Sequence, residues 1–296
     1  LLAWPCVVAV PSQPTRPVPT QETPNMTPLT IGACLKTPDI KDHRDWLFDA
    51  ARDIELQDFM THAALTSEFD ARIGAAKTAL DGHTGRLGIH GPFEGLDIDN
   101  KDAELRPIIT SRFLKALEAA DRIGARQMVL HSPYTAWYQN NIFSFPGYSE
   151  NKLARIQVVL DPVVRTAEEM GIKLVIENIQ DVRPETRRAM VDSFGSSAIA
   201  LSIDTGHAQL ARRMSYAPPV ADFGADAGAQ LAHVHLQDVD GHADRHWAPG
   251  EGEIEWTAVF RALCACKSDP HLVLELREKA DIMKGFSALQ NLGLVI

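Results

Sequence analysis

From Leu29 onward, short apolar or β-branched runs alternate with longer segments in which apolar residues recur at helical spacing. This alternation is typical of parallel strands joined by helices. The segments 106–124 and 154–171 each end on a glycine just before the next apolar run, as expected at a helix C-terminus. Eight runs qualify as strands, and they lie near residues 29, 54, 86, 127, 173, 199, 231 and 271. Eight such units predict an α/β chain with a single (β/α)8 (TIM) barrel over residues 29–296.

Two other parts of the chain have a different pattern. Residues 1–28 combine a short apolar run with a stretch rich in Pro, Thr and Gln, so we expect a disordered or leader-like extension outside the core. The stretch NNIFSFPGYSE, residues 140–150, is interpreted as an extended loop placed to act as a lid. A doubly wound sheet is the main rival fold, but no G-x-G-x-x-G or P-loop follows the first strand.

Composition narrows the functional classes. With 45% hydrophobic and 23% charged residues and no apolar run approaching the roughly 18 needed to span a bilayer, we expect a soluble, cytoplasmic protein without a membrane partner. The formal charge of -10 argues against a nucleic-acid partner, which requires a basic footprint. A homo-oligomer is compatible with the sequence. The four cysteines are scattered, and we interpret them as reduced thiols without a functional role: Cys6, Cys34, Cys264 and Cys266.

Polar residues close nearly every predicted strand from the third onward. In a TIM barrel the active site lies at the carboxyl ends of the strands, so these side chains are expected to converge. Buried together, they would be mutually repulsive without a cation. Mixed carboxylate and imidazole ligands suit Mn, Mg, Co or Zn, and we predict a bound divalent metal. The residues are His90, His131, Glu177, Asp204, His207, His235 and Glu275.

The histidine-rich stretch 231–256 contains further polar residues that we assign to other roles. We expect the His235 side chain on the seventh strand to point into the barrel and the His233 side chain to point to the opposite face, in a structural role. Asp238, Asp240 and His242 are interpreted as a solvated loop.

The segments HGPF, LHSPY, IEN, IDTGH, HLQD and DRHWAPGEGEIEW together resemble the xylose isomerase-like, AP endonuclease family 2 barrels over roughly residues 29–290. In the sugar isomerase and epimerase branch, the resemblance implies four metal ligands: Glu177, Asp204, His235 and Glu275. It also implies that Glu177 and Glu275 move a proton through an enediolate while the metal polarises the substrate carbonyl. The remaining residues expected to face the sugar substrate are His90, His131, His207, His246 and, for a phosphorylated substrate, Arg245 or Arg277.

The repair branch of the same superfamily implies a different chemistry. Its endonuclease IV-like members hold three zinc ions with nine ligands and cleave abasic DNA. All nine residue types match here, because His90, His131, His207, Asp244 and His246 supply the five additional metal ligands. The ligand inventory alone therefore leaves this phosphodiesterase as an alternative.

Two segments favour the sugar branch. The stretch HGPFEGLDIDNKDAELRP carries carboxylates that would face a phosphate backbone badly, and HWAPGEGEIEW has the Pro-Gly-x-Gly form of the isomerase-like members. The aromatic residues after the fourth strand either stack on a sugar or fold inward: Trp137, Tyr138, Phe143 and Phe145. We therefore predict a metal-dependent isomerase or epimerase acting on a small-molecule sugar, sugar phosphate or polyol, with a related dehydratase and a non-catalytic barrel as further alternatives.

Overall fold

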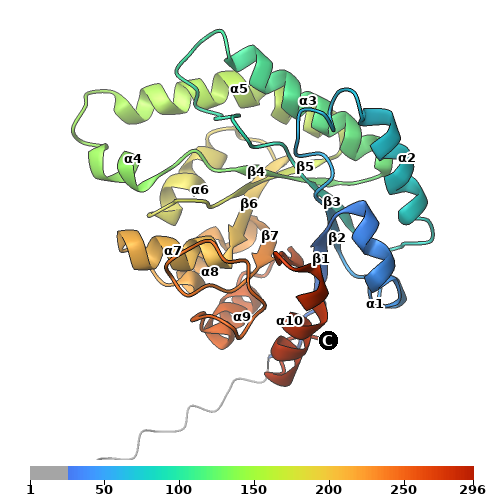
Figure 1. The fold of residues 1–296 in the computed structure, drawn as a ribbon. Coiled ribbons are helices and arrows are strands. Elements are labelled where there is room, and N and C mark those ends of the chain that lie inside the picture. Colours follow the sequence, from blue (N-terminus) through green and yellow to red (C-terminus); the bar gives the residue numbers. More distant parts are fainter. Residues whose placement is uncertain (1–25) are drawn as a thin grey trace, which may run out of the picture.

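The computed structural model describes residues 26–296, and its centre is a closed barrel of eight parallel strands (Figure 1). Each strand pairs with its sequence neighbours, and β8 pairs with β1 to close the barrel. The strands are β1 (Gly32–Leu35), β2 (Ile54–Leu56), β3 (Leu87–His90), β4 (Gln127–His131), β5 (Lys173–Glu177), β6 (Ile199–Asp204), β7 (Leu231–Leu236) and β8 (His271–Leu274). The eight predicted strands and the (β/α)8 fold class are confirmed.

Helices surround the barrel and bury their apolar faces against it. Helix α3 ends at Gly124, whose φ of 83° lies in the left-handed region that its place in the sequence predicts. The α-helices are α1 (Arg44–Asp49), α2 (Phe69–Ala79), α3 (Arg106–Ile123), α4 (Ala136–Asn141), α5 (Tyr148–Met170), α6 (Pro184–Asp192), α7 (Thr205–Ser215), α8 (Val220–Ala227), α9 (Trp256–Ala265) and α10 (Ile282–Asn291). The short 3-10 helices are η1 (Thr37–His43), η2 (Gly228–Gln230) and η3 (Lys279–Asp281).

The strand register brings the polar strand ends together. His131 on β4 pairs with Glu177 on β5, and Asp204 on β6 pairs with His235 on β7. β4, β5 and β6 are buried along most of their length and each ends on a polar residue at the rim, whereas β7 also carries His233 in mid-strand. The barrel therefore gathers at one rim residues that are far apart in the sequence.

The segment predicted as an extended loop, residues 140–150, is helical at both ends and a loop only in its middle. Helix α4 extends to Asn141 and α5 begins at Tyr148, so only residues 142–147 connect them. The Thr135 side chain accepts a hydrogen bond from the Tyr138 backbone N–H and thereby caps the start of α4. Gly147, with a φ of 67°, turns the chain into α5. The prediction of an extended loop is therefore wrong for residues 140–141 and 148–150, where the capped helices continue, and agrees with the structure over residues 142–147.

The start of the described chain joins its end. Leu29 forms a parallel bridge with Val295, and its backbone N–H donates to Leu294. The predicted extension over residues 1–28 lies outside the described residues apart from residues 26–28. Within residues 26–296, no helix combines the length and apolar character that crossing a membrane requires.

Gly32 and Gly74 provide a stability test. A Cβ on Gly32 would lie 1.7 Å from the backbone oxygen of Asp53, the residue before β2, whereas one on Gly74, in α2, would meet nothing within 4 Å. We expect Gly32→Ala to lower the free energy of unfolding by at least ~1–3 kcal/mol, since the barrel must open to admit the methyl group. Gly74→Ala, the matched control, is expected to raise it by about 0.5–1 kcal/mol. Urea denaturation measures both, and equal stability of the two variants would contradict this account of β1.

Candidate metal centre and active site

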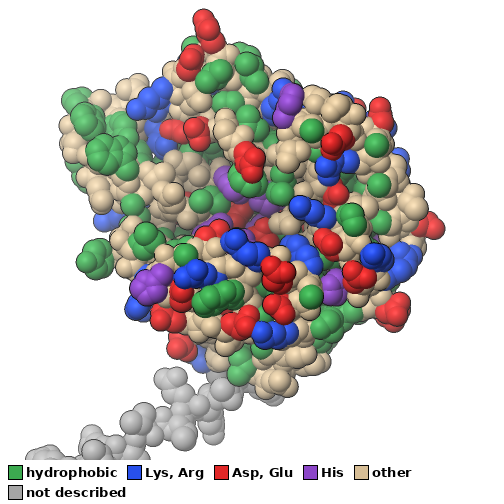
Figure 2. Space-filling model, in the orientation of Figure 1, with side chains coloured by type: hydrophobic (Ala, Val, Ile, Leu, Met, Phe, Trp, Pro, Cys, Tyr) green, Lys and Arg blue, Asp and Glu red, His purple; other side chains and the backbone are tan. Residues whose placement is uncertain are grey.

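A cavity of about 790 Å³ opens at the carboxyl ends of the strands. Figure 2 shows histidine side chains at the bottom of a hollow in this face of the molecule. The cavity is lined by Lys36, Asp39, Gln57, Met60, His90, Phe93, His131, Glu177, Ile179, His207, Asp244, His246, Glu275, Leu276, Arg277 and Lys279. Most of the strand-end residues singled out in the sequence therefore face one shared space.

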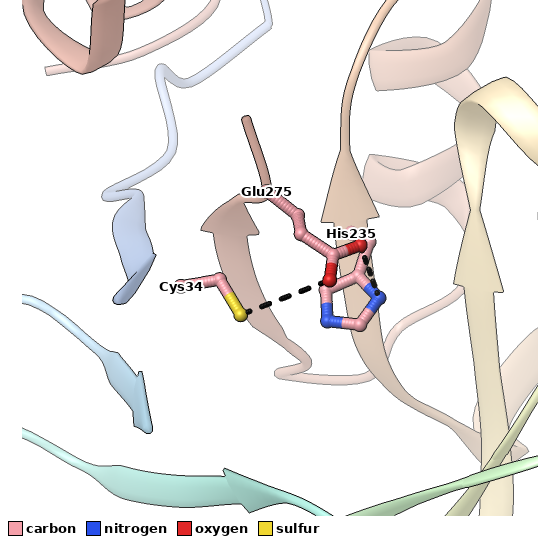
Figure 3. A group of neighbouring side chains, drawn as sticks. All are labelled: Cys34, His235 and Glu275. Carbon is pink, nitrogen blue, oxygen red and sulfur yellow. Dashed lines mark hydrogen bonds and ion pairs between the residues drawn. The ribbon is translucent and has the colours of Figure 1, made fainter. Parts of the chain in front are cut away.

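The central group of this site consists of Glu177, Asp204, His235 and Glu275, all of them buried. Their candidate ligand atoms all lie within 4.8 Å of one another. His235 Nδ1 is 3.3 Å from Glu177 Oε1 and 3.3 Å from Glu275 Oε2, and Figure 3 shows the imidazole facing the Glu275 carboxylate. Among the described residues, neither Glu177 Oε2 nor His235 Nδ1 has a hydrogen-bond partner. Three buried carboxylates around an imidazole nitrogen without a partner fit a divalent cation.

A second group shares Glu177 with the central group. The Nε2 atoms of His90 and His131 each lie 3.7 Å from Glu177 Oε2, and they are 3.3 Å from each other. His131 stacks on Phe93, with 4.3 Å between ring centroids. Burial lowers the pKa of His131 to about 4, so its imidazole is neutral at physiological pH, as metal ligation requires.

A third group lies on the other side of the central group's carboxylates. Asp244 Oδ1 is 3.4 Å from His207 Nε2 and 3.1 Å from His246 Nε2. Burial lowers the pKa of His246, but the hydrogen bond to Asp244 and the charge of Glu275 outweigh it and raise this pKa to about 9. Without a metal, this group is an ion-paired cluster, and binding an ion here would displace protons.

Asp204 is held in place through its own backbone. Asn178 accepts from the Asp204 backbone N–H at 2.9 Å and donates to its carbonyl at 3.0 Å. The buried Arg187 guanidinium donates to Asn178 at 3.1 Å, and Gln237 donates to the Asp204 carboxylate at 3.0 Å. Burial raises the pKa of Asp204 to about 6, so this carboxyl gains from a neighbouring cation.

The loop that carries Asp244 and His246 is built around Asp238. This side chain is fully buried and accepts hydrogen bonds from the Gly250 backbone N–H at 2.8 Å and from Trp256 Nε1 at 3.0 Å. The interpretation of Asp238 as a solvated loop residue is wrong, because its partners lie 12 and 18 residues further along the chain. His246 has a φ of 51°, an uncommon conformation for a non-glycine residue, and its backbone N–H donates to Gln237.

Glu55, on β2, was missed by the sequence analysis. It lies inside the barrel, with Oε1 3.0 Å from His235 Nε2 and Oε2 2.9 Å from His233 Nε2. The prediction that His233 and His235 point to opposite faces is wrong. Residues two apart on a strand share a face, and both imidazoles point to Glu55. Cys34 Sγ donates to Glu55 Oε1 at 3.0 Å and lies 4.0 Å from Glu275 Oε1 (Figure 3). The sequence signal that could have identified Glu55 is a single acidic residue between two apolar residues of a strand.

Arg245 is not among the residues that line the cavity. Its guanidinium pairs with Asp240 at 2.9 Å and lies over the Trp247 ring. Arg277, the other candidate for phosphate recognition, does line the cavity.

The four aromatic residues after β4 lie outside the lining of the large cavity. Tyr138 is buried and tilted against Tyr134, whereas Trp137 is 67% exposed and Phe143 is 97% exposed. Phe145 is also largely exposed, beside Tyr148. Of the two predicted roles, stacking on a sugar or folding inward, the second applies to Tyr138.

Comparison with known proteins assigns the family. The sequence matches the family described as "Xylose isomerase-like TIM barrel" over residues 48–292. The chain belongs to this family. The resemblance inferred from the strand-end motifs is therefore confirmed, and the closed barrel with its polar rim is the family's fold in this chain.

Sequence relatives of this family member include two uncharacterized proteins of Methanocaldococcus jannaschii. MJ1311 is 25% identical over 209 residues, which are 69% of this chain and 68% of that protein. MJ1614 is 22% identical over 174 residues, 57% of this chain and 62% of that protein. They share the barrel sequence without adding a function.

Solved structures with the same fold include three of particular interest. The TTHB071 protein from Thermus thermophilus, soaked with ZnCl2, is 26% identical with a TM-score of 0.67, covering 89% of this chain and 98% of that one. A D-tagatose 3-epimerase-like protein is 21% identical with a TM-score of 0.73, covering 89% and 96%. The 3-keto-D-glucoside 4-epimerase YcjR from E. coli is 17% identical with a TM-score of 0.66, covering 89% and 99%.

The central group gives a prediction for stability. We expect Mn, Co or Zn to raise the Tm of chelator-treated protein, since the ion relieves the cost of burying three carboxylates together. At a concentration 100 times the Kd, binding to the native state alone adds about 2.7 kcal/mol to the free energy of unfolding. Differential scanning calorimetry measures the shift. Asp204→Asn should reduce it, and Glu251→Gln, on the surface, should not. A Tm unchanged by all three metals would argue against a metal centre.

Proposed function

We propose that this protein is a divalent-metal-dependent isomerase or epimerase acting on a small sugar, sugar phosphate or polyol. The observation that carries the proposal is the central group, in which Glu177 and Glu275 both contact His235 and both open into the cavity. Two carboxylates beside a metal, at the bottom of a cavity of about 790 Å³, suit proton transfer on a small polar substrate. The shared fold with a D-tagatose 3-epimerase-like protein and a keto-glucoside epimerase supports this substrate class.

The metal would be held by Glu177, Asp204, His235 and Glu275. When bound, it would polarise a substrate carbonyl and acidify the neighbouring C–H. Burial would raise the pKa of Glu177, but the charge of His235 and the nearby imidazoles of His207 and His90 hold it well below the usual range. Glu177 is therefore ionised and able to take a proton from carbon.

Glu275 is prepared for the complementary role. Gln57 Nε2 donates to Glu275 Oε1 at 2.7 Å, and Oε2 faces the imidazoles of His235 and His246 at 3.3 and 3.6 Å. Burial opposes the ionisation of Glu275, but His235 and His246 lower its pKa overall. One of the two carboxylates removes the proton. Its return to the same carbon by the other carboxylate, from the opposite face, gives the epimer, whereas its return to the neighbouring carbonyl carbon gives the isomer.

The histidines of the second and third groups complete the substrate site. His207 and His246 line the cavity on the side of Asp244, and their ring nitrogens are placed to hydrogen-bond substrate oxygens. His90 and His131 line it beside Glu177. In this mononuclear mechanism they orient the substrate.

Proton exchange tests the roles of the two glutamates. We expect Glu177→Gln and Glu275→Gln each to slow exchange of the substrate's carbon-bound proton with deuterated water, by about 10²–10⁴-fold, because the amide cannot accept that proton. NMR of the recovered sugar measures exchange, and metal analysis of each variant separates lost chemistry from lost metal. Glu251→Gln, a surface carboxylate paired with Lys284, is the control. Retained exchange in both site variants would reject these roles.

The second and third groups favour one other function, that of a three-metal phosphodiesterase acting on abasic DNA. His90 and His131 share Glu177 with the central group, and His207, Asp244 and His246 form a further set of ligands. Metal analysis distinguishes the two functions. The isomerase proposal expects one exchangeable divalent ion per chain and no incision of an abasic-site duplex. Three retained zinc ions together with incision would replace it with the phosphodiesterase.

A further inference from the structure

Three basic side chains lie at the cavity: Lys36, which follows β1, and Arg277 and Lys279, which follow β8. Figure 2 shows Lys and Arg side chains along one edge of the histidine-lined hollow. They lie there although the chain as a whole carries a formal charge of -10. A concentration of cations at a cavity of an acidic protein points to a negatively charged ligand.

Two of these cations are held in place by uncharged partners. Lys279 Nζ donates to Gln57 Oε1 at 3.1 Å, and the same Gln57 donates to Glu275. Arg277 Nη2 donates to the Asp244 backbone carbonyl at 2.8 Å, and its Nε donates to the Arg245 carbonyl at 3.3 Å. Both cations are thus tied to the residues that surround the candidate metal centre.

Their charges are not neutralised by ion pairs. Among residues 26–296, no carboxylate oxygen lies within 4.0 Å of the charged nitrogens of Lys36, Arg277 or Lys279. By contrast, Arg245, whose backbone carbonyl accepts from Arg277, forms an ion pair with Asp240. Of the acidic residues that line the cavity, Asp39 accepts from the Lys36 backbone N–H, and Glu177, Asp244 and Glu275 belong to the candidate metal-ligand groups.

We infer that Lys36, Arg277 and Lys279 form a subsite for a phosphoryl group, and that the substrate is a sugar phosphate. The inference rests on the proposed function, since it places the sugar carbonyl at the central group and the phosphate at these cations. A phosphate monoester offers several oxygens to the ammonium and guanidinium donors. A nucleic-acid backbone offers the same chemistry, but the net negative charge of the chain opposes binding a long polyanion.

Binding measurements test the subsite without requiring turnover. Calorimetry of the metal-loaded protein would compare a ketohexose with its 6-phosphate, and inorganic phosphate would serve as competitor. We expect the phosphate ester to bind at least tenfold more tightly, and Arg277→Ala and Lys279→Ala each to weaken it by about tenfold, as for hydrogen bonds to charged groups. Binding of the unphosphorylated sugar should change little. Lys41→Ala, an exposed lysine outside the cavity lining, is the matched control.

Each outcome decides between specific alternatives. Equal affinity for sugar and ester, or ester affinity unchanged in both variants, would overturn the subsite. An abasic oligonucleotide that binds through Arg277 and Lys279 while the sugar phosphate does not would assign the cations to nucleic acid and overturn the sugar-phosphate inference. Variant-dependent binding of the ester without proton exchange on any sugar would support the subsite and reject the proposed isomerase.

A second inference comes independently from Glu55, inside the barrel. Its carboxylate lies 3.0 Å from Nε2 of His235, while Nδ1 of the same ring faces Glu177 and Glu275. Glu55 is itself fixed from β7, because the Ser202 hydroxyl lies 2.8 Å from His233 Nδ1 and His233 Nε2 lies 2.9 Å from Glu55. We infer that Glu55 is a positioning residue that keeps the Nε2–H tautomer of His235 and so presents Nδ1 to the metal.

Metal affinity and the His235 tautomer test this role together. We expect Glu55→Ala to weaken metal binding about 10–100-fold in a chelator competition, as for other carboxylates that orient a ligating histidine. Glu55→Gln, whose amide oxygen still accepts one N–H, should recover part of the loss and covers the case in which the alanine variant fails to fold. Nitrogen-15 NMR of the zinc-loaded protein should show the Nε2–H tautomer of His235 in the wild type and its loss in the alanine variant. Unchanged metal affinity in a folded Glu55→Ala variant, or in Glu55→Gln where the alanine variant does not fold, would overturn the inference.

Discussion

The electrostatic cost of burying carboxylates at one end of the barrel constrains the rest of the structure. Glu55, Glu177, Asp204 and Glu275 are all withdrawn from water, and without compensation the cost would be several kcal/mol per ion. The imidazole of His235 lies among them, with one ring nitrogen toward Glu55 and the other toward Glu177 and Glu275. The alternation of carboxylates and imidazoles lowers this cost, and a cation at the centre would complete the compensation.

The fold supplies the rigidity that this array needs. Parallel pairing fixes the heights at which β4 to β7 end, so that His131 meets Glu177 and Asp204 meets His235. Buried polar contacts behind the site, such as those of Arg187 with Asn178 and of Asp238 with the loop after β7, hold the ligands from outside. The site therefore depends on the barrel's register as well as on the identity of its ligands.

The sequence predicted the fold and the strand-end residues because both follow from regular periods: apolar runs mark strands, and a polar residue closing such a run marks the rim. It did not identify Glu55 as a site residue, because Glu55 lies in the middle of its strand. The expected face of His233 was wrong, because residues two apart on a strand point to the same side. The burial of Asp238 and the helical ends of residues 140–150 could not be predicted either, because long-range hydrogen bonds determine the first and local capping determines the second. The isolation of Arg245 from the cavity likewise depends on its pairing with Asp240.

Glu177 belongs to two of the ligand groups, because His90 and His131 approach one of its oxygens while His207 and His235 approach the other. An ion bound at the central group would neutralise part of the charge of Glu177 and so weaken the binding of a second ion by Glu177, His90 and His131. An ion bound by those three residues would weaken binding at the central group in the same way. Thermodynamic linkage makes such an effect reciprocal. Successive ions would then bind with negative cooperativity, so a metal titration of this protein should depart from an independent-site isotherm, and the number of ions it carries should depend on the free metal concentration around it.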